Sequence, residues 1–260
     1  MVIVLENHEF GDVIGNAAAP TINALAGRYG SATRAFGTTH PSLPNYLELI
    51  SGSTHGVTSD CTSCTASGPN LADQLDQKGI DWVALFEGMP SPCFTGASAS
   101  NGYAKKHNPF VYFPALVANA KQCGRLQPAS AFDAALTNPT PPAFIWLTPN
   151  LCNDGHDCGI DVADTWLKDT MARVQSSHWY AEGGAVVITW DEGTTSASCC
   201  QSAHGGHMPT LVVSERIPAG TRSDTPISHA GILRTIEDAY GLPHLGDAEC
   251  SCSGNLHPLL

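Results

Sequence analysis

Two segments of the chain are almost continuously apolar, and they constrain the fold more than any other feature. They are residues 2–5 (Val-Ile-Val-Leu) and residues 185–190 (Ala-Val-Val-Ile-Thr-Trp). A strand without a polar face is typical of the centre of a parallel sheet that helices cover on both sides. Similar short runs alternate along the chain with amphipathic helical stretches. This alternation predicts an α/β fold with a doubly wound, largely parallel sheet and helices on both faces.

The expected elements follow from this pattern. We predict strands at 1–5, 32–36, 82–86, 143–147, 185–190 and 210–214, and helices at 20–29, 44–51, 71–78, 131–136, 162–175 and 230–240. Four of the helices are followed by a glycine that can end them, at Gly30, Gly52, Gly79 and Gly241. No internal repeat or low-complexity linker interrupts the chain, so residues 1–260 are expected to form a single domain with loop-rich insertions at 88–108 and after 246.

Composition excludes several classes of protein. With 42% hydrophobic and 14% charged residues, the 260-residue chain can bury a core and is not expected to be disordered. No apolar run reaches the ~18 residues that a membrane-spanning helix needs. The net charge is −12, and Lys105-Lys106 is the only adjacent basic pair, so nucleic acid is not an expected partner. Met1 leads directly into a strand without a basic leader, which predicts a mature soluble domain.

Ten cysteines indicate disulfides and therefore secretion. The close pairs Cys61/Cys64, Cys152/Cys158 and Cys250/Cys252 are typical of short closed loops. The alternative is that Cys61 and Cys64 form half of a zinc site, but no second half follows at the usual spacing. The adjacent residues Cys199 and Cys200 either pair with each other or pair elsewhere, and spacing alone does not decide the connectivity.

Acidic and amide side chains follow three of the predicted strands. They are Glu6-Asn7, Asn153-Asp154 with His156, and Asp191-Glu192. The carboxyl ends of parallel strands meet at one edge of the sheet, where these carboxylates would repel one another unless a divalent cation neutralised them. Each cluster alone is better explained as a helix cap. Three clusters, together with His204 and His207, predict a metal site for zinc, manganese, iron or calcium.

Residues 37–46 form a hydroxyl-rich loop that leads into a helix which Pro44 can open. A hydroxyl at a helix N-terminus beside a metal is a candidate nucleophile, and the alternative is an ordinary cap. The chain contains no Gly-x-Ser-x-Gly elbow, no Gly-x-Gly-x-x-Gly loop, no phosphate-binding Gly-x4-Gly-Lys loop and no His-Glu-x-x-His. These absences argue against the commonest esterases, dehydrogenases, nucleotide triphosphatases and zinc proteases.

Several motifs together resemble a known family. They are Glu6-Asn7-His8, residues 39–46 (Thr-His-Pro-Ser-Leu-Pro-Asn-Tyr), His107-Asn108, Asp154-Gly155-His156-Asp157 and Trp190-Asp191-Glu192. In this order they resemble the phosphoesterase family, which holds bacterial phospholipases C and acid phosphatases within the alkaline phosphatase superfamily. The resemblance extends from residue 3 to about residue 245.

The resemblance implies roles for individual residues. The first metal would be held by Glu6, Asn7, Asp191 and Glu192, and Thr39 would be the nucleophile. A second metal would be held by Asp154, His156 and His207, with Asn150 as an alternative to Asp154. Family members with one metal exist, so the cofactor is one or two divalent ions. His107 is implied as a catalytic group in contact with phosphate, and Asn108 and Ser42 as substrate-binding residues.

These observations predict a secreted, metal-dependent phosphate-ester hydrolase that forms a phospho-threonine at Thr39. Its partner would be a small phosphate ester or a phospholipid head group. We favour a phosphomonoesterase because the chain is short, although residues 110–117 could form the apolar lip of a phospholipase C or phosphodiesterase. From another class, a non-catalytic secreted module that binds a metal or an anion would bind metal without turnover.

Overall fold

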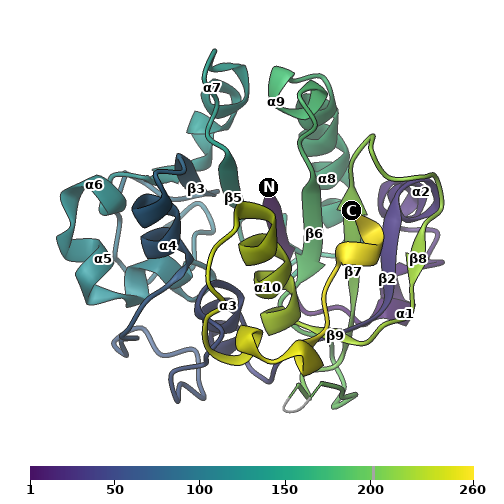
Figure 1. The fold of residues 1–260 in the computed structure, drawn as a ribbon, viewed down its shortest axis with the longest axis horizontal. Coiled ribbons are helices and arrows are strands. Elements are labelled where there is room, and N and C mark those ends of the chain that lie inside the picture. The colour runs from purple at the N-terminus through teal and green to yellow at the C-terminus, as the bar shows by residue number, and fades with distance from the viewer. Residues whose placement is uncertain (201–202) are drawn as a thin grey trace.

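The computed structural model describes residues 1–200 and 203–260, which form one sheet of nine strands with helices around it (Figure 1). The strand order is β4-β3-β5-β1-β6-β7-β2-β8, and β9 pairs with β2. The strands are β1 Val2–Leu5, β2 Gly30–Phe36, β3 Trp82–Phe86, β4 Leu126–Pro128, β5 Phe144–Thr148, β6 Val186–Trp190, β7 His207–Val213, β8 Arg222–Ser223 and β9 Ile227–Ser228. All neighbours are parallel except for β7, which runs antiparallel to β6 and β2.

The helices lie on both faces of this sheet. The α-helices are α1 Phe10–Val13, α2 Pro20–Arg28, α3 Ser42–Ser51, α4 Leu71–Lys78, α5 Pro114–Ala118, α6 Ala120–Cys123, α7 Phe132–Thr137, α8 Ile160–Gln175, α9 His178–Ala181 and α10 His229–Tyr240. Short 3-10 turns occupy Lys105–His107, Pro109–Tyr112, Ala129–Ala131, Gly246–Glu249, Ser251–Ser253 and His257–Leu259. Helix α3 packs on α10 and α2 packs on α8. The predicted α/β class and its two-sided helical cover are confirmed.

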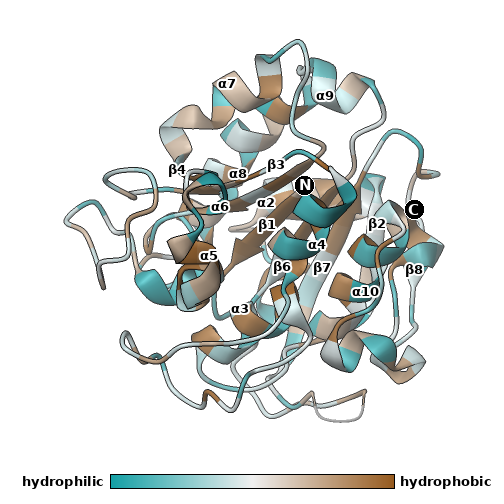
Figure 2. Cartoon of the chain, turned by 60° about the vertical axis from the view of Figure 1, so that its left-hand side comes forward, coloured by the Kyte–Doolittle hydropathy of each residue, from teal (hydrophilic) through white to brown (hydrophobic). Residues whose placement is uncertain are grey.

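The apolar segments behave as their composition predicts. Every residue of β1, β5 and β6 is buried, and Figure 2 shows the central strands in the hydrophobic colour. The central strand β1 lies between β5 and β6, and all four of its residues are buried. Among the described residues, no helix is long and apolar enough to cross a membrane.

Two element boundaries differ from the prediction in a way that matters for the site. Helix α3 begins at Ser42 rather than at residue 44, so Ser42 lies in its first turn. Strand β7 begins at His207 rather than at residue 210, because Phe36 of β2 pairs with His207 and extends the ladder. Ser42 is therefore a helical residue, and His207 is the first residue of a strand.

All ten cysteines form disulfides, and no described cysteine is free. The three predicted short loops are closed by Cys61–Cys64, Cys152–Cys158 and Cys250–Cys252. Cys199 and Cys200 form a vicinal disulfide. Cys93 and Cys123, which lie 30 residues apart, form the fifth bond and attach the loop after β3 to α6. The disulfide interpretation is confirmed, and Cys61 and Cys64 do not form half of a zinc site.

Candidate active site

The predicted acidic residues lie together at the carboxyl edge of the sheet. Glu6 follows β1, Asp191 and Glu192 follow β6, and Asp154 lies in the turn after β5. Backbone hydrogen bonds join the three segments side by side. Glu6 N donates to Asp154 O at 2.9 Å, and Asp191 N donates to Leu5 O at 3.0 Å. Glu6, Asp154 and Asp191 are completely buried. The sheet topology therefore brings together side chains up to 186 residues apart.

Glu6 is at the centre of the site. Its Oε1 accepts a hydrogen bond from Tyr46 OH at 2.5 Å, and its Oε2 accepts one from Ser42 Oγ at 3.0 Å. Burial, followed by the charges of Asp191 and Asp154, raises the pKa of Glu6 well above its usual value. Such surroundings favour the neutral carboxyl, and a cation beside Glu6 would favour its charged form.

His107 joins Glu6 to Asp154. Its Nε2 lies 3.3 Å from Glu6 Oε1, and its Nδ1 lies 3.2 Å from Asp154 Oδ2. Each of these three buried residues offers a ligand atom, and the three atoms lie within 4.8 Å of one another. Burial lowers the pKa of His107 to about 3 and raises that of Asp154 to about 7. His107 is therefore a neutral imidazole, the form that can ligate a metal.

A second group of oxygens gathers around Asn7. One end of its side-chain carboxamide lies 3.1 Å from Glu192 Oε1 and 3.3 Å from Asp191 Oδ1. Burial, and for Glu192 also the charge of Asp191, raises the pKa of both carboxyls, that of Glu192 to about 9. The backbone of Asn7 has a φ of 47°, in the left-handed region that a non-glycine residue rarely adopts. The amide nitrogen of Asn7 can donate to both carboxylates, and a hard divalent cation bound between them would instead take the amide oxygen.

Buried polar atoms that lack a hydrogen-bond partner indicate whether these residues fit a metal. Asp191 Oδ2, Asp154 Oδ2 and His107 Nε2 are buried, and in the part of the chain that the structure describes they have no hydrogen-bond partner. Buried polar atoms in folded proteins are normally paired. Three such atoms on one cluster, all of ligand type, fit a bound cation. The residues therefore fit a metal, although their oxygens and imidazole do not select among zinc, manganese, iron and calcium.

The structure places the two candidate hydroxyls differently. Ser42 is buried in the first turn of α3, with its Oγ on Glu6 and beside Asp191 and Glu192. Thr39 is only partly buried in the preceding loop, and its Oγ1 lies 3.2 Å from His204 Nε2. It is Ser42 that lies among the carboxylates.

The Thr39 backbone is held in place by Asn45. Asn45 Oδ1 accepts from Thr39 N at 2.9 Å, and Asn45 Nδ2 donates to Thr39 O at 2.8 Å. These two bonds fix the loop against helix α3, and with it the path of the chain into Ser42. The structure therefore gives the Thr39 backbone a structural role that its sequence position did not reveal.

Three other residues predicted for the site, His156, Asn108 and His207, lie at different places relative to the carboxylates. His156 lies at the rim, with its Nε2 3.0 Å from Lys106 Nζ. Asn108 is buried and donates from Nδ2 to Tyr103 OH at 3.1 Å. The structure does not bring His207 into the group: its Nε2 lies 2.9 Å from Thr33 O, and its ring stacks between Phe10 and Phe36 at 4.6 and 5.2 Å between ring centroids.

Three residues of the site were not predicted from the sequence. Tyr46 lies four residues after Ser42, so helical spacing could have placed both on one face of α3. His40 contacts Glu192 Oε2 through Nδ1 and Thr195 O through Nε2 at 2.9 Å. Asp60 contacts Lys106, and no local pattern marks it.

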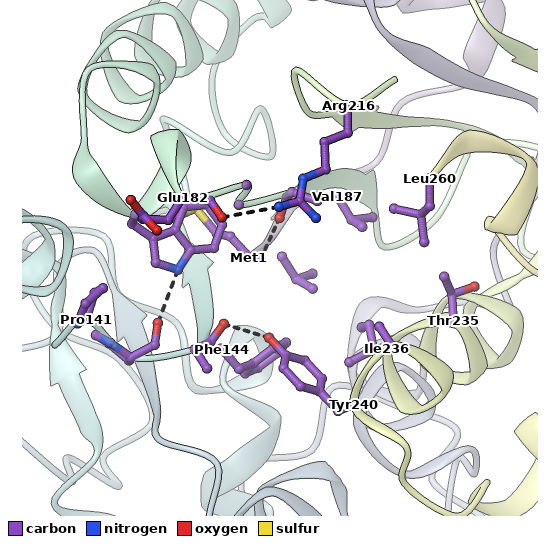
Figure 3. A pocket seen from close by; sticks show the side chains of 18 residues that line it. Met1, Pro141, Phe144, Glu182, Val187, Arg216, Thr235, Ile236, Tyr240 and Leu260 are labelled. Atoms are coloured by element: carbon purple, nitrogen blue, oxygen red, sulfur yellow. Dashed lines mark hydrogen bonds between the residues drawn. The ribbon is translucent and has the colours of Figure 1, made fainter. Parts of the chain in front are cut away.

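A pocket of about 490 Å³ lies at the opposite edge of the sheet (Figure 3). It is lined by residues at the amino ends of the strands, including Met1 and Phe144, and by Trp179, Arg216 and Tyr240 from other segments. Its lining is largely apolar, and the described residues that form it include no group of metal-ligating side chains, so we place the chemistry at the carboxyl edge.

Comparison with known proteins identifies the family. A family model described as the phosphoesterase family matches residues 14–243, which includes most of the motifs at the site. The chain belongs to the phosphoesterase family. It is 34% identical over 252 residues to a phosphatidylinositol-3-phosphatase of Mycobacterium tuberculosis, and the match covers 95% of this chain and 78% of that protein. The family resemblance seen in the sequence is therefore confirmed.

Fungal relatives are longer than this chain. A probable acid phosphatase of Kluyveromyces lactis is 31% identical, and the match covers 94% of this chain and 58% of that protein. An acid phosphatase of Aspergillus fumigatus is 30% identical, with 96% and 56% covered. The chain thus spans a little over half the length of these two proteins. Phosphatase relatives support phosphoesterase activity for this family member.

Solved structures confirm the architecture. The lipoteichoic acid synthase LtaP of Listeria monocytogenes superposes with a TM-score of 0.64 at 11% identity, covering 97% of this chain and 74% of that one. A phosphonate monoester hydrolase of Agrobacterium radiobacter gives 0.62 at 15% identity, covering 98% and 77%. A protein of the alkaline phosphatase superfamily from Vibrio parahaemolyticus gives 0.60 at 13% identity, covering 93% and 66%. At these identities the likeness shows the fold alone.

Proposed function

We propose that this phosphoesterase is a secreted, metal-dependent phosphomonoesterase of the acid phosphatase type, and that Ser42 rather than Thr39 is its nucleophile. The observation that carries the proposal is the contact of 3.0 Å between Ser42 Oγ and Glu6 Oε2 among buried carboxylates. Five disulfides support an extracytoplasmic site of action, because such bonds persist in oxidising compartments.

The metal supplies two effects when bound: it lowers the pKa of a nearby hydroxyl, and it neutralises charge on the phosphoryl oxygens. Glu6, Asn7, Asp191 and Glu192 are the residues that would hold it, and Glu6, His107 and Asp154 offer a second position. In this proposal His107 is a ligand rather than a group that contacts phosphate, because it is buried between two carboxylates.

The protein's own residues account for the rest of the reaction. Glu6 holds the Ser42 hydroxyl in position, and the start of helix α3 directs a partial positive charge at the incoming phosphoryl group. The Ser42 hydroxyl loses its proton to solvent water as its oxygen bonds to phosphorus, and the ester oxygen leaves with a proton from solvent as the free alcohol. Water then bonds to phosphorus, inorganic phosphate is released, and a proton returns to the Ser42 oxygen.

A monoester substrate is favoured over a phospholipid diester by the position of residues 110–117. Phe110, Val111, Tyr112, Phe113 and Leu116 are all buried, and the exposed residues of the segment are the small Pro114 and Ala115, so it presents no large exposed apolar side chain to acyl chains. Within the described residues, Leu260 is the only exposed large hydrophobic side chain. The named relatives that act on phosphate esters are phosphatases, which agrees with this choice.

The test is the release of phenolate from an aryl phosphate monoester and from the matching diester, before and after chelation, with divalent ions then added back. We expect faster monoester turnover that chelation abolishes and one of the ions restores. Faster diester turnover would indicate a phosphodiesterase, and metal binding without any turnover would indicate a binding module. Ser42→Ala should lower kcat at least about a thousandfold, whereas Thr39→Ala should cost about tenfold or less.

A further inference from the structure

The carboxylate of Asp60 lies near the proposed nucleophile, but its contacts are with two hydrogen-bond donors and not with the proposed metal ligands. Asp60 lies in the loop between α3 and α4, 17 residues after Leu43. Its Oδ1 accepts a hydrogen bond from Leu43 N at 3.0 Å, and its Oδ2 pairs with Lys106 Nζ at 3.0 Å. The Asp60 carboxylate thus accepts a hydrogen bond from a backbone amide at the start of α3 and forms an ion pair with an ammonium group.

A backbone amide and an ammonium group are the kinds of donor that a phosphoryl group beside Ser42 needs. Leu43 directly follows Ser42, so its N–H lies next to the proposed nucleophile in the first turn of the helix. Pro44, the next residue, has no N–H, which leaves the first turn with few free amides. The charge of the Lys106 ammonium acts on the cluster as well, because Glu6, then Asp60 and Asp191, raise its pKa.

We propose that Asp60 competes with the phosphoryl group of the substrate for the Leu43 amide and the Lys106 ammonium, and that the substrate must displace it in order to bind. The inference rests on the proposed phosphatase function, since it takes the phosphoryl group to lie beside Ser42. Leu43 has a single N–H, so Asp60 Oδ1 and a phosphoryl oxygen cannot both accept its full hydrogen bond, and two anions held at one ammonium repel each other. A substrate therefore binds with an affinity that is reduced by the fraction of molecules in which Asp60 occupies the donors.

The structure lets Asp60 leave without disturbing its loop. The side chain is 29% exposed, so it has a path to solvent, whereas Glu6 and Asp191 have none. The loop itself is held beside the site by other bonds: Lys105 Nζ donates to Thr62 O at 2.6 Å, and Cys61 is bonded to Cys64. Lys106 Nζ also lies 3.0 Å from His156 Nε2, a contact that does not involve Asp60.

The experiment compares Asp60→Ala and Asp60→Asn with the wild-type enzyme. Steady-state kinetics with an aryl phosphate monoester gives KM and kcat, and calorimetry gives the Kd of inorganic phosphate. We expect Asp60→Ala to lower KM and the phosphate Kd about tenfold while kcat stays within about twofold. Asp60→Asn keeps an acceptor for Leu43 N but loses the charge that holds Lys106, so it should give a smaller decrease of the same sign.

Asp12→Ala is the matched control for charge alone. Asp12 is exposed in the short helix after β1, and its side chain touches neither donor. Removing it should change KM less than twofold. An unchanged or raised KM and phosphate Kd in both Asp60 variants, with native circular dichroism, would overturn the inference and make Asp60 a residue that positions Lys106. Absence of turnover in the wild-type enzyme would refute the proposed function instead, and the phosphate Kd would still test Asp60.

Discussion

Replacement of Asp191 by asparagine should stabilise the metal-free protein while it removes activity. Asp191 Oδ1 accepts hydrogen bonds from Asn7 N at 3.1 Å and Glu192 N at 2.7 Å, and the amide oxygen introduced by Asp191→Asn can accept the same two bonds. The substitution therefore changes the charge and leaves the local backbone supported. What it removes is the repulsion that Asp191 exerts on Glu6 and Glu192.

The magnitude follows from the geometry around Asn7. One atom of its amide lies 3.1 Å from Glu192 Oε1 and 3.3 Å from Asp191 Oδ1. Two unit charges no more than about 6 Å apart repel by about 3 kcal/mol at an effective dielectric constant of about 20. Proton uptake relieves part of this repulsion, so we expect a gain of about 2 kcal/mol, which raises Tm by about 4 to 8 °C in a protein of this size.

The assay is thermal unfolding followed by circular dichroism in the presence of a chelator. The pKa values of Asp154 and Glu192 are raised to about 7 and about 9 in the fold. Their contribution to stability is complete below pH 4 and is lost as the pH rises through these values. The Tm difference between Asp191→Asn and wild type should therefore be large at pH 8 and small at pH 5. Added metal should raise the Tm of wild type more than that of the variant.

The control is Asp224→Asn, an exposed residue outside the cluster, which should shift Tm by about 1 °C or less. A lower Tm for Asp191→Asn in chelator at pH 8 would refute the electrostatic reasoning, because it would mean that the Asp191 charge stabilises the metal-free fold.

Two further predictions concern residues outside the acidic cluster. His207→Phe should retain activity within about threefold, because the ring is stacked between Phe10 and Phe36; a loss of more than about a hundredfold in kcat/KM would place His207 at the metal instead. Burial and the charge of Asp247 raise the pKa of Glu48 to about 8, so its contribution to stability is complete below pH 4 and is lost as the pH rises through 8. Tm should consequently decrease between pH 5 and pH 8.5, and Glu48→Gln should flatten that dependence; equal slopes for the two proteins would contradict it.

The fold could be predicted because its causes are local. An apolar strand buried on both faces shows in its own residues, as in 2–5 and 186–190, and a glycine ends a helix within one turn, as Gly79 ends α4. Carboxylates at strand ends could also be predicted to converge, because parallel topology brings those ends together.

Other parts of the site depend on contacts between distant segments, which sequence spacing does not encode. Asp60 reaches Leu43 through the path of a loop, and His207 is placed by Phe10 and Phe36 from two other elements. The family resemblance pointed to Thr39, and only the contact between Ser42 Oγ and Glu6 Oε2, made across 36 residues of sequence, distinguishes the two hydroxyls.

The most direct test of the mechanism is to locate the phosphoryl group on the enzyme. Metal-loaded protein would be mixed with an aryl phosphate monoester, quenched with acid within milliseconds, digested and analysed by mass spectrometry. Our interpretation predicts phosphate on Ser42, and none in Ser42→Ala. Phosphate on Thr39, or steady turnover by Ser42→Ala at the wild-type rate, would contradict it.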